Sequence, residues 1–308
     1  MNGLLDGVVV PMVTTMSAPG VPDPDAAGPL LRAFAAAGVR RLMLLGSNGE
    51  GPLVRADRTA AYVAGVADRW RALVPAGVIL VNVTAPGTDE ARHRAELAAV
   101  ASPDALVLSP PIYFRHSDAE VVAHYAAVAA LGLPIVAYNT PRYATPLTPS
   151  TVDSLVAMPG IVGAKDSSGD PAMLAHLLAA AGTRTGFAVS QGDEQALGAA
   201  LRAGASGIVP GIANLAPRLA VDLVAAHDQG DRAEVDRLQA LATELTRLHS
   251  VRPGVPSVKA LLASWGLCPP HAAPPLLACT PDELRRLAAV VRPIGAYLLG
   301  GHDDAKEG

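Results

Sequence analysis

Lysine is rare in this sequence, and one lysine closes an apolar stretch that predicts a buried strand. Three of the 24 basic residues are lysines, so arginine carries most of the positive charge. Lys165 ends the stretch Ile161–Lys165. Burial there disfavours the ammonium form, and a neutral amine can attack a carbonyl group to form an iminium. An ion pair with Asp166 or Glu194 that only stabilises the fold explains this segment equally well.

The loop Gly46-Ser47-Asn48-Gly49-Glu50 combines hydrogen-bonding side chains with small residues after another apolar stretch. Such a loop can direct backbone N–H groups toward an anion, and the carboxylate of a small acid would fit. A tight turn that uses glycine and asparagine for positive φ angles explains the same residues without a ligand. For Glu50 we expect a structural role, in which its carboxylate accepts backbone N–H bonds and shapes the loop.

Two of the six tyrosines follow predicted strand ends. Tyr138 begins the sequence Tyr138-Asn139-Thr140-Pro141, and Tyr113 ends the sequence Pro110-Pro111-Ile112-Tyr113. A phenol between Lys165 and a substrate can shuttle protons if its pKa is tuned. Taken singly, each tyrosine is also explained as a half-buried residue that bonds a backbone group.

Two carboxylates, Asp193 and Glu194, follow a further predicted strand. Their oxygens can accept hydrogen bonds from the hydroxyl groups of a substrate. Capping of the next helix is the commoner role for an aspartate in such a place.

Several other kinds of site find no support. The eight histidines are scattered, and no HxH, HExxH or His/Cys cluster follows a predicted strand, so we expect no metal. There is no P-loop and no GxSxG motif. The net charge of −4 offers no basic surface for nucleic acid.

The elements that must position these residues alternate in a regular way. Short apolar stretches without in/out alternation predict strands buried on both faces, and amphipathic alanine-rich segments separate them. Eight repeats of strand and helix predict an α/β fold, a closed parallel (β/α)8 barrel of the TIM type, over an open doubly wound sheet. The predicted strands are Val8–Val13, Leu42–Leu45, Val78–Val83, Ala105–Ser109, Ile135–Tyr138, Ile161–Lys165, Phe187–Ser190 and Gly207–Pro210.

The strands stop after Pro217. We predict helices over Ala220–Leu241, Ser257–Trp265 and Pro281–Tyr297. Residues 1–228 are therefore expected to form the catalytic barrel, and residues 229–308 a small helical region packed on it.

The cysteine content and the N-terminal residues indicate the cellular location. Cys268 and Cys279 are the only cysteines and stand in no CxxC motif, which favours a reducing cytoplasm. Met1–Val13 lacks the basic start of a signal peptide. The charge-free stretch Val121–Pro141 is interrupted by glycine and proline, so it predicts a helix and a strand, with no membrane span.

Together these segments resemble the dihydrodipicolinate synthase / N-acetylneuraminate lyase family of pyruvate-dependent class I aldolases. The resemblance runs from about Gly7 to about Gly266. Four motifs carry it in order: Gly46-Ser47-Asn48-Gly49-Glu50, Tyr138-Asn139-Thr140-Pro141, Ile161-Val162-Gly163-Ala164-Lys165-Asp166-Ser167-Ser168-Gly169, and Gly207-Ile208-Val209-Pro210 with Asn214 and Pro217.

The resemblance implies a set of catalytic roles. Lys165 would form a Schiff base with pyruvate or another 2-oxo acid, and no further cofactor would be needed. Tyr138 would shuttle protons, and Ser47 would pass them between Tyr138 and Tyr113. In the family, the tyrosine that matches Tyr113 comes from a neighbouring subunit, and a homotetramer built as a dimer of dimers is expected.

The resemblance also implies binding roles. Ser47 and Asn48 would hold the carboxylate of the 2-oxo acid through backbone N–H groups and side chains. The carbonyl group of Ile208 would line the site. Asp193 and Glu194 match a segment that holds sugar hydroxyls in the sialic-acid lyase, which implies a polyhydroxylated 2-oxo acid as a substrate.

The sequence departs from the family at three places. Asn48 replaces a threonine of the loop. Tyr143 stands where an arginine usually binds the carboxylate of the aldehyde, and Arg142 lies one place earlier. Ile112 replaces the first of two paired tyrosines, which puts the interface stacking and the lysine feedback site of the synthase in doubt.

These observations favour a lyase or aldolase acting on pyruvate or on a pyruvate-derived 2-oxo acid, such as a 2-keto-3-deoxy sugar acid. One alternative is 4-hydroxy-tetrahydrodipicolinate synthase, which condenses pyruvate with aspartate semialdehyde. A dehydratase or decarboxylating hydratase can use the same iminium. From another class, the chain could be a non-catalytic barrel that binds 2-oxo acids.

Overall fold

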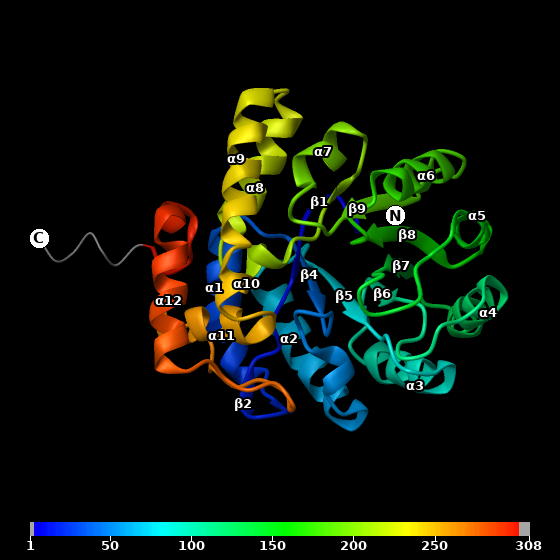
Figure 1. Cartoon of the computed structure of the whole chain (residues 1–308). Helices are drawn as coiled ribbons and strands as arrows, with labels where there is room; N and C mark the ends of the chain where they lie inside the picture. The colour runs from blue at the N-terminus through cyan, green and yellow to red at the C-terminus, as the bar shows by residue number, and fades with distance from the viewer. Residues whose placement is uncertain (1–2, 302–308) are drawn as a thin grey trace, which may run out of the picture.

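Eight parallel strands close into a barrel in the computed structural model, which describes residues 3–301 (Figure 1). The order around the barrel is β1-β10-β9-β8-β7-β6-β5-β4. The fold prediction is confirmed, and each predicted strand overlaps an observed one. The strands are β1 Gly7–Pro11, β4 Arg41–Leu44, β5 Val78–Asn82, β6 Ala105–Leu108, β7 Ile135–Asn139, β8 Ile161–Asp166, β9 Ala188–Gln191 and β10 Gly207–Ile208.

Helices cover the outside of the barrel, and Figure 1 shows α3 to α6 following one another around the strands. Their starts are fixed by local side chains. Ser117 and Glu120 form a capping box before α4, and Thr148 and Asp170 cap α5 and α6. The helices are α1 Gly28–Ala36, α2 Thr59–Leu73, α3 Thr88–Ala99, α4 Asp118–Ala129, α5 Pro149–Ala157, α6 Pro171–Ala181, α7 Leu197–Arg202 and α8 Pro217–Asp228.

The apolar core has two layers, as buried parallel strands require. The larger cluster lies between the strands and the surrounding helices. A smaller cluster fills the barrel interior below the site; its members are Leu5, Val9, Met43, Leu80, Ala105, Val107, Val136, Tyr138 and Val209. The interior is therefore a packed floor, and reactive side chains can stand above it at the carboxyl ends of the strands.

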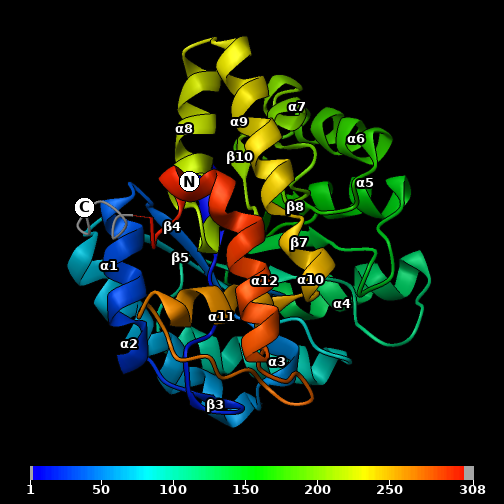
Figure 2. The same ribbon diagram turned by 60° about the vertical axis from the view of Figure 1, so that its left-hand side comes forward.

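Up to Gly301, the C-terminal region packs against the barrel with four α-helices: α9 Arg232–Leu245, α10 Leu248–Val251, α11 Val255–Ser264 and α12 Pro281–Val291. Figure 2 shows α10, α11 and α12 grouped together, with α8 and α9 side by side above them. One expectation was wrong. The single helix predicted over Ala220–Leu241 is two helices, because Gly230 adopts a φ of 75° and turns the chain between α8 and α9.

Smaller elements complete the described chain. A hairpin of β2 Met16–Ala18 and β3 Val21–Pro22 was not predicted. Short 3-10 helices are Asp25–Ala27, Gly51–Leu53, Ala56–Arg58, Gly211–Asn214 and Arg292–Tyr297, and the last takes up the end of the helix predicted to reach Tyr297. Among residues 3–301, no helix has both the length and the apolar character that crossing a membrane requires.

Candidate active site

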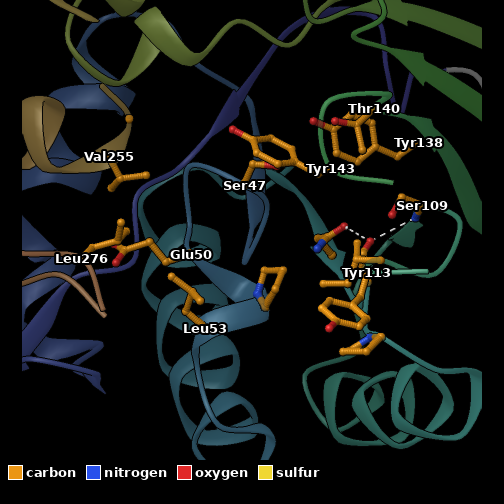
Figure 3. A pocket seen from close by; sticks show the side chains of 16 residues that line it. Ser47, Glu50, Leu53, Ser109, Tyr113, Tyr138, Thr140, Tyr143, Val255 and Leu276 are labelled. Carbon is orange, nitrogen blue, oxygen red and sulfur yellow. Dashed lines mark hydrogen bonds between the residues drawn. The ribbon is translucent and has the colours of Figure 1, made fainter. Parts of the chain in front are cut away.

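The carboxyl ends of the strands surround a cleft with two lobes. One lobe, of about 470 Å³, contains Lys165 and is rich in polar side chains. The other, of about 560 Å³, is mainly apolar (Figure 3). We call them the polar lobe and the apolar lobe. They meet at shared lining residues, which are Ser47, Tyr138, Thr140, Tyr143, Gly254 and Val255.

Lys165 lies near the end of β8 and is 4% exposed. Its Nζ atom lies 4.2 Å from the centre of the Tyr138 ring. Because β7 and β8 pair with Tyr138 opposite Lys165, both side chains point to the same face of the sheet, the barrel interior. The strand register therefore brings the predicted nucleophile and the predicted proton shuttle together.

Neither carboxylate that the sequence offered as a partner forms an ion pair with Lys165; within residues 3–301 the ion pairs involve other cations. The Asp166 carboxylate is held from other sides. Asn139 donates to Oδ1 over 2.8 Å, and the Ser168 hydroxyl donates to Oδ2 over 2.9 Å. Burial raises the pKa of Asp166, although these bonds oppose the shift. The ion-pair explanation of Lys165 thus loses its geometric basis.

Gly192 leaves room for the lysine stem. A Cβ atom at this position would lie 2.9 Å from Cε of Lys165 and would also collide with the Ser167 hydroxyl. The Gln191 side chain fixes the turn, because its Oε1 accepts the N–H groups of Gly192 and Asp193, both over 2.8 Å. The close approach of the Ser167 and Lys165 side chains to this backbone favours glycine here.

Tyr138 is almost fully buried, and its surroundings lower the pKa of its phenol. Burial alone raises the pKa of its phenol. The charge of Lys165 and the neighbouring hydroxyls of Thr140, Ser47 and Ser167 outweigh burial, so the pKa lies below its usual value. A phenol that gives up its proton more readily beside an amine suits proton transfer.

The loop that holds Ser47 and Asn48 is a compact turn between β4 and a 3-10 helix. The backbone N–H of Glu50 donates to the carbonyl of Ser47 over 3.2 Å. A Cβ on Gly49 would lie 2.8 Å from the Leu45 nitrogen, which makes this glycine a packing requirement. The N–H groups of Ser47 and Asn48 have no backbone acceptor within residues 3–301, so they are available to an anion.

Asp193 and Glu194 both line the polar lobe, and each also has a structural bond. Asp193 accepts the N–H of Gln195 over 3.1 Å, as a turn cap does. Glu194 accepts the N–H of Gly211 over 2.8 Å. A Cβ on Gly211 would approach both the Glu194 carboxylate and the Asn48 amide within 3.0 Å, so these two side chains face the same small space.

Glu194 yields a prediction on stability. Burial raises its carboxyl pKa, against the opposing effects of backbone N–H groups and the Lys165 charge. Since the pKa in the folded protein exceeds the unfolded value of about 4.3, ionisation lowers the free energy of unfolding as the pH rises through the folded-state value. Glu194→Gln removes this loss and keeps an acceptor for Gly211. We expect the Tm of the variant, relative to the parent, to rise between about pH 4 and about pH 8.

The matched control is Glu96→Gln, which makes the same change at an exposed position on α3. Thermal unfolding of all three proteins at both pH values measures the effect. If the difference in Tm between Glu194→Gln and the parent stays constant with pH, burial does not raise the pKa of the Glu194 carboxyl.

Three other predicted residues differ in how they relate to the two lobes. Tyr113 is 88% exposed, has a φ of 89° and lines only the apolar lobe, with its ring edge-on to Phe114. Arg142 is exposed but does line the polar lobe. Ile208 is fully buried behind the lobe, whereas the next residue, Val209, lines it. The roles proposed for these three residues stay predictions.

Some lining residues were missed by sequence reasoning. Thr140, Ser167 and Ser168 line the polar lobe. They belong to the motifs given above, so their hydroxyls could have been predicted to lie at the site. Under the apolar lobe, the Thr84 hydroxyl donates to Asn82 over 2.9 Å and accepts the N–H of Ser109 over 3.0 Å. No sequence pattern predicted this series of hydrogen bonds. Within residues 3–301, no group of three or more His, Cys, Asp or Glu side chains is arranged to hold a metal ion.

Comparison with known proteins identifies the family. Residues 4–294 match the Dihydrodipicolinate synthetase family. A DapA-like lyase of Halobacterium salinarum, itself uncharacterized, is 31% identical over 293 residues, 94% of each chain. A 4-hydroxy-tetrahydrodipicolinate synthase of Stenotrophomonas maltophilia is 34% identical over 271 residues, covering 85% of this chain and 88% of that protein.

Solved structures show the same architecture. The dihydrodipicolinate synthase of Bacteroides thetaiotaomicron superposes with a TM-score of 0.87 at 26% identity, covering 95% of this chain and all of that one. A prophage protein of the same family from E. coli K12, solved in complex with pyruvate, shares the fold with a TM-score of 0.88 at 24% identity, covering 95% of this chain and 99% of that one. The chain therefore belongs to the dihydrodipicolinate synthetase family and is a lyase of that family.

Proposed function

We propose that this protein forms a Schiff base between Lys165 and a 2-oxo acid, pyruvate or a derivative of it, and makes or breaks the adjacent carbon–carbon bond. The observation that carries the proposal is the buried Lys165 amine, without a carboxylate partner in residues 3–301, 4.2 Å from the Tyr138 ring. An amine free of an ion pair keeps its lone pair available once it loses its proton. No cofactor is required, because the iminium itself serves as the electron sink.

The steps follow from the positions of the side chains. The Lys165 amine attacks the carbonyl carbon, Tyr138 supplies the proton that lets water leave, and the iminium forms. Tyr138, left as a phenolate, then takes a proton from the neighbouring carbon and gives an enamine, which attacks an aldehyde. Water releases the product from Lys165, and the reverse sequence cleaves a 4-hydroxy-2-oxo acid. Ser47 and Asn48 hold the substrate carboxylate with their N–H groups and position the acid for attack.

The polar lobe favours a hydroxylated second substrate. Asp193 and Glu194 offer acceptors for hydroxyl groups, and Arg142 lies at the same lobe. We therefore propose a 2-keto-3-deoxy sugar acid as the substrate class. Condensation with aspartate semialdehyde is the second candidate, because a relative of 34% identity is a 4-hydroxy-tetrahydrodipicolinate synthase and Arg142 can receive a carboxylate.

The proposal extends to assembly and location. Tyr113 and Phe114, which are 88% and 66% exposed, form an aromatic pair at the edge of the apolar lobe. We propose that a homotetramer, a dimer of dimers, covers them and brings Tyr113 of a neighbouring subunit toward Ser47. With two free cysteines, Cys268 and Cys279, a cytoplasmic protein is proposed. Analytical ultracentrifugation tests the assembly.

Turnover assays distinguish the candidates. Cleavage of 2-keto-3-deoxygluconate, followed as released pyruvate, should exceed condensation of pyruvate with aspartate semialdehyde, and EDTA should not change the rate. The opposite preference identifies the synthase. Loss of activity with EDTA would contradict the Schiff-base proposal, and pyruvate binding without turnover of any acceptor would identify a non-catalytic binder.

A further inference from the structure

A second lysine is buried at the other side of the cleft. Lys259 lies on α11 and is 0% exposed. Its Nζ atom lies 2.5 Å from Oε1 of Glu50 and donates to the carbonyl of His271 over 2.7 Å. Burial lowers the pKa of Lys259, and the charge of Glu50 opposes the shift. No step of the proposed mechanism uses this ion pair.

Glu50 connects this ion pair to the loop that carries Ser47. Its backbone N–H donates to the Ser47 carbonyl, and its φ of 56° sets the direction in which the chain leaves the turn. Its Oε2 accepts the N–H of Ala273 over 2.5 Å. Oε1 has no hydrogen-bond partner of good geometry within residues 3–301, so the charge of Lys259 is what compensates it.

The helix that carries Lys259 also reaches the cleft. Val255, the first residue of α11, and Gly254 before it line both lobes. Figure 3 shows Val255 and Glu50 on the same side of the pocket, opposite Tyr138. Burying two charges is costly, and an apolar pair of similar volume often supports a fold equally well. The position of this pair, between the loop 46–50 and the helix that reaches the cleft, therefore suggests a role in geometry.

We propose that Lys259 is a positioning residue: its ion pair with Glu50 ties the loop 46–50 to the C-terminal helices and holds Ser47 and Asn48 where they meet the substrate carboxylate. This inference rests on the proposed function, since it concerns the capture of a 2-oxo acid by Lys165. It assigns the C-terminal region a part in substrate binding.

The test measures how much pyruvate is needed to trap half of the protein with borohydride. Lys259→Met removes the charge at similar length but leaves Glu50 unpaired, which endangers folding. The double variant Glu50→Gln/Lys259→Met removes both charges of the pair and keeps an acceptor for Ala273. We expect the double variant to unfold near the parental Tm and to need on the order of tenfold more pyruvate, with the same maximal trapping at Lys165.

Two controls separate positioning from stability. Leu287→Ala opens a cavity in α12, where Leu287 is fully buried, and should lower the Tm without changing the pyruvate requirement. Lys259→Arg keeps the charge and should shift the requirement less than the double variant does. A parental pyruvate requirement in the folded double variant would overturn the inference. Absence of any adduct in the parent would instead contradict the proposed function.

Discussion

Replacement of Lys165 by methionine should abolish turnover, with a loss on the order of 10⁴-fold or more, and should leave the protein folded. Methionine matches the length of the lysine stem but has no amine, so no iminium can form. Because Lys165 has no ion pair within residues 3–301, we expect the Tm of the variant to equal or exceed that of the parent. Steady-state assays and thermal unfolding measure the two effects.

The stability measurement tests separately whether Lys165 has a structural role. If Lys165 served a structural ion pair, its removal would leave a buried carboxylate uncompensated and would cost about 3–5 kcal/mol. A marked fall in Tm together with retained turnover would therefore identify a structural lysine, and the catalytic assignment would be wrong.

Tyr138→Phe should slow turnover by about 10²–10⁴-fold, because the variant lacks the hydroxyl that moves protons at the carbinolamine and the enamine. Lys165 should still be trapped slowly by pyruvate and borohydride. Since the pKa of Tyr138 lies below the ordinary tyrosine value of about 10, the parent should show a limb in its pH–rate profile below that pH, and the variant should lose it.

Tyr125→Phe makes the same chemical change away from the site. The Tyr125 hydroxyl donates to the Leu108 carbonyl over 2.7 Å, among side chains between the barrel and α4. Its removal should cost about 1 kcal/mol of stability and leave the rate unchanged. A Tyr138→Phe variant with parental turnover and pH profile would remove Tyr138 from the mechanism.

The barrel could be predicted because burial on both faces leaves a simple trace in the sequence. Each strand is a short apolar stretch such as Ile135–Asn139, and an α-helix follows each one along the chain. The split between α8 and α9 escaped prediction. Gly230 lies inside a pattern with helical periodicity on both sides, and that periodicity outweighed the local signals of the turn, which are Gly230 itself and the Asp231 cap of α9.

The centre of the site could also be predicted, because its residues lie at strand ends and the register between neighbouring strands brings them together. Tyr138 and Lys165 meet since β7 and β8 pair there. The partners of Glu50 could not be predicted, because Ala273 lies 223 residues farther along the chain and no periodicity links the two. The exposed position of Tyr113 was likewise hidden, since its backbone conformation depends on the loop around it.

The most direct test of the central claim is borohydride reduction in the presence of pyruvate, followed by mass mapping of the peptides. The structure predicts one reduced pyruvate adduct per chain, on the peptide that contains Lys165. Lys259, although fully buried, should stay unmodified because Glu50 and the His271 carbonyl hold its ammonium group. An adduct on Lys259, or none at all, would contradict the account.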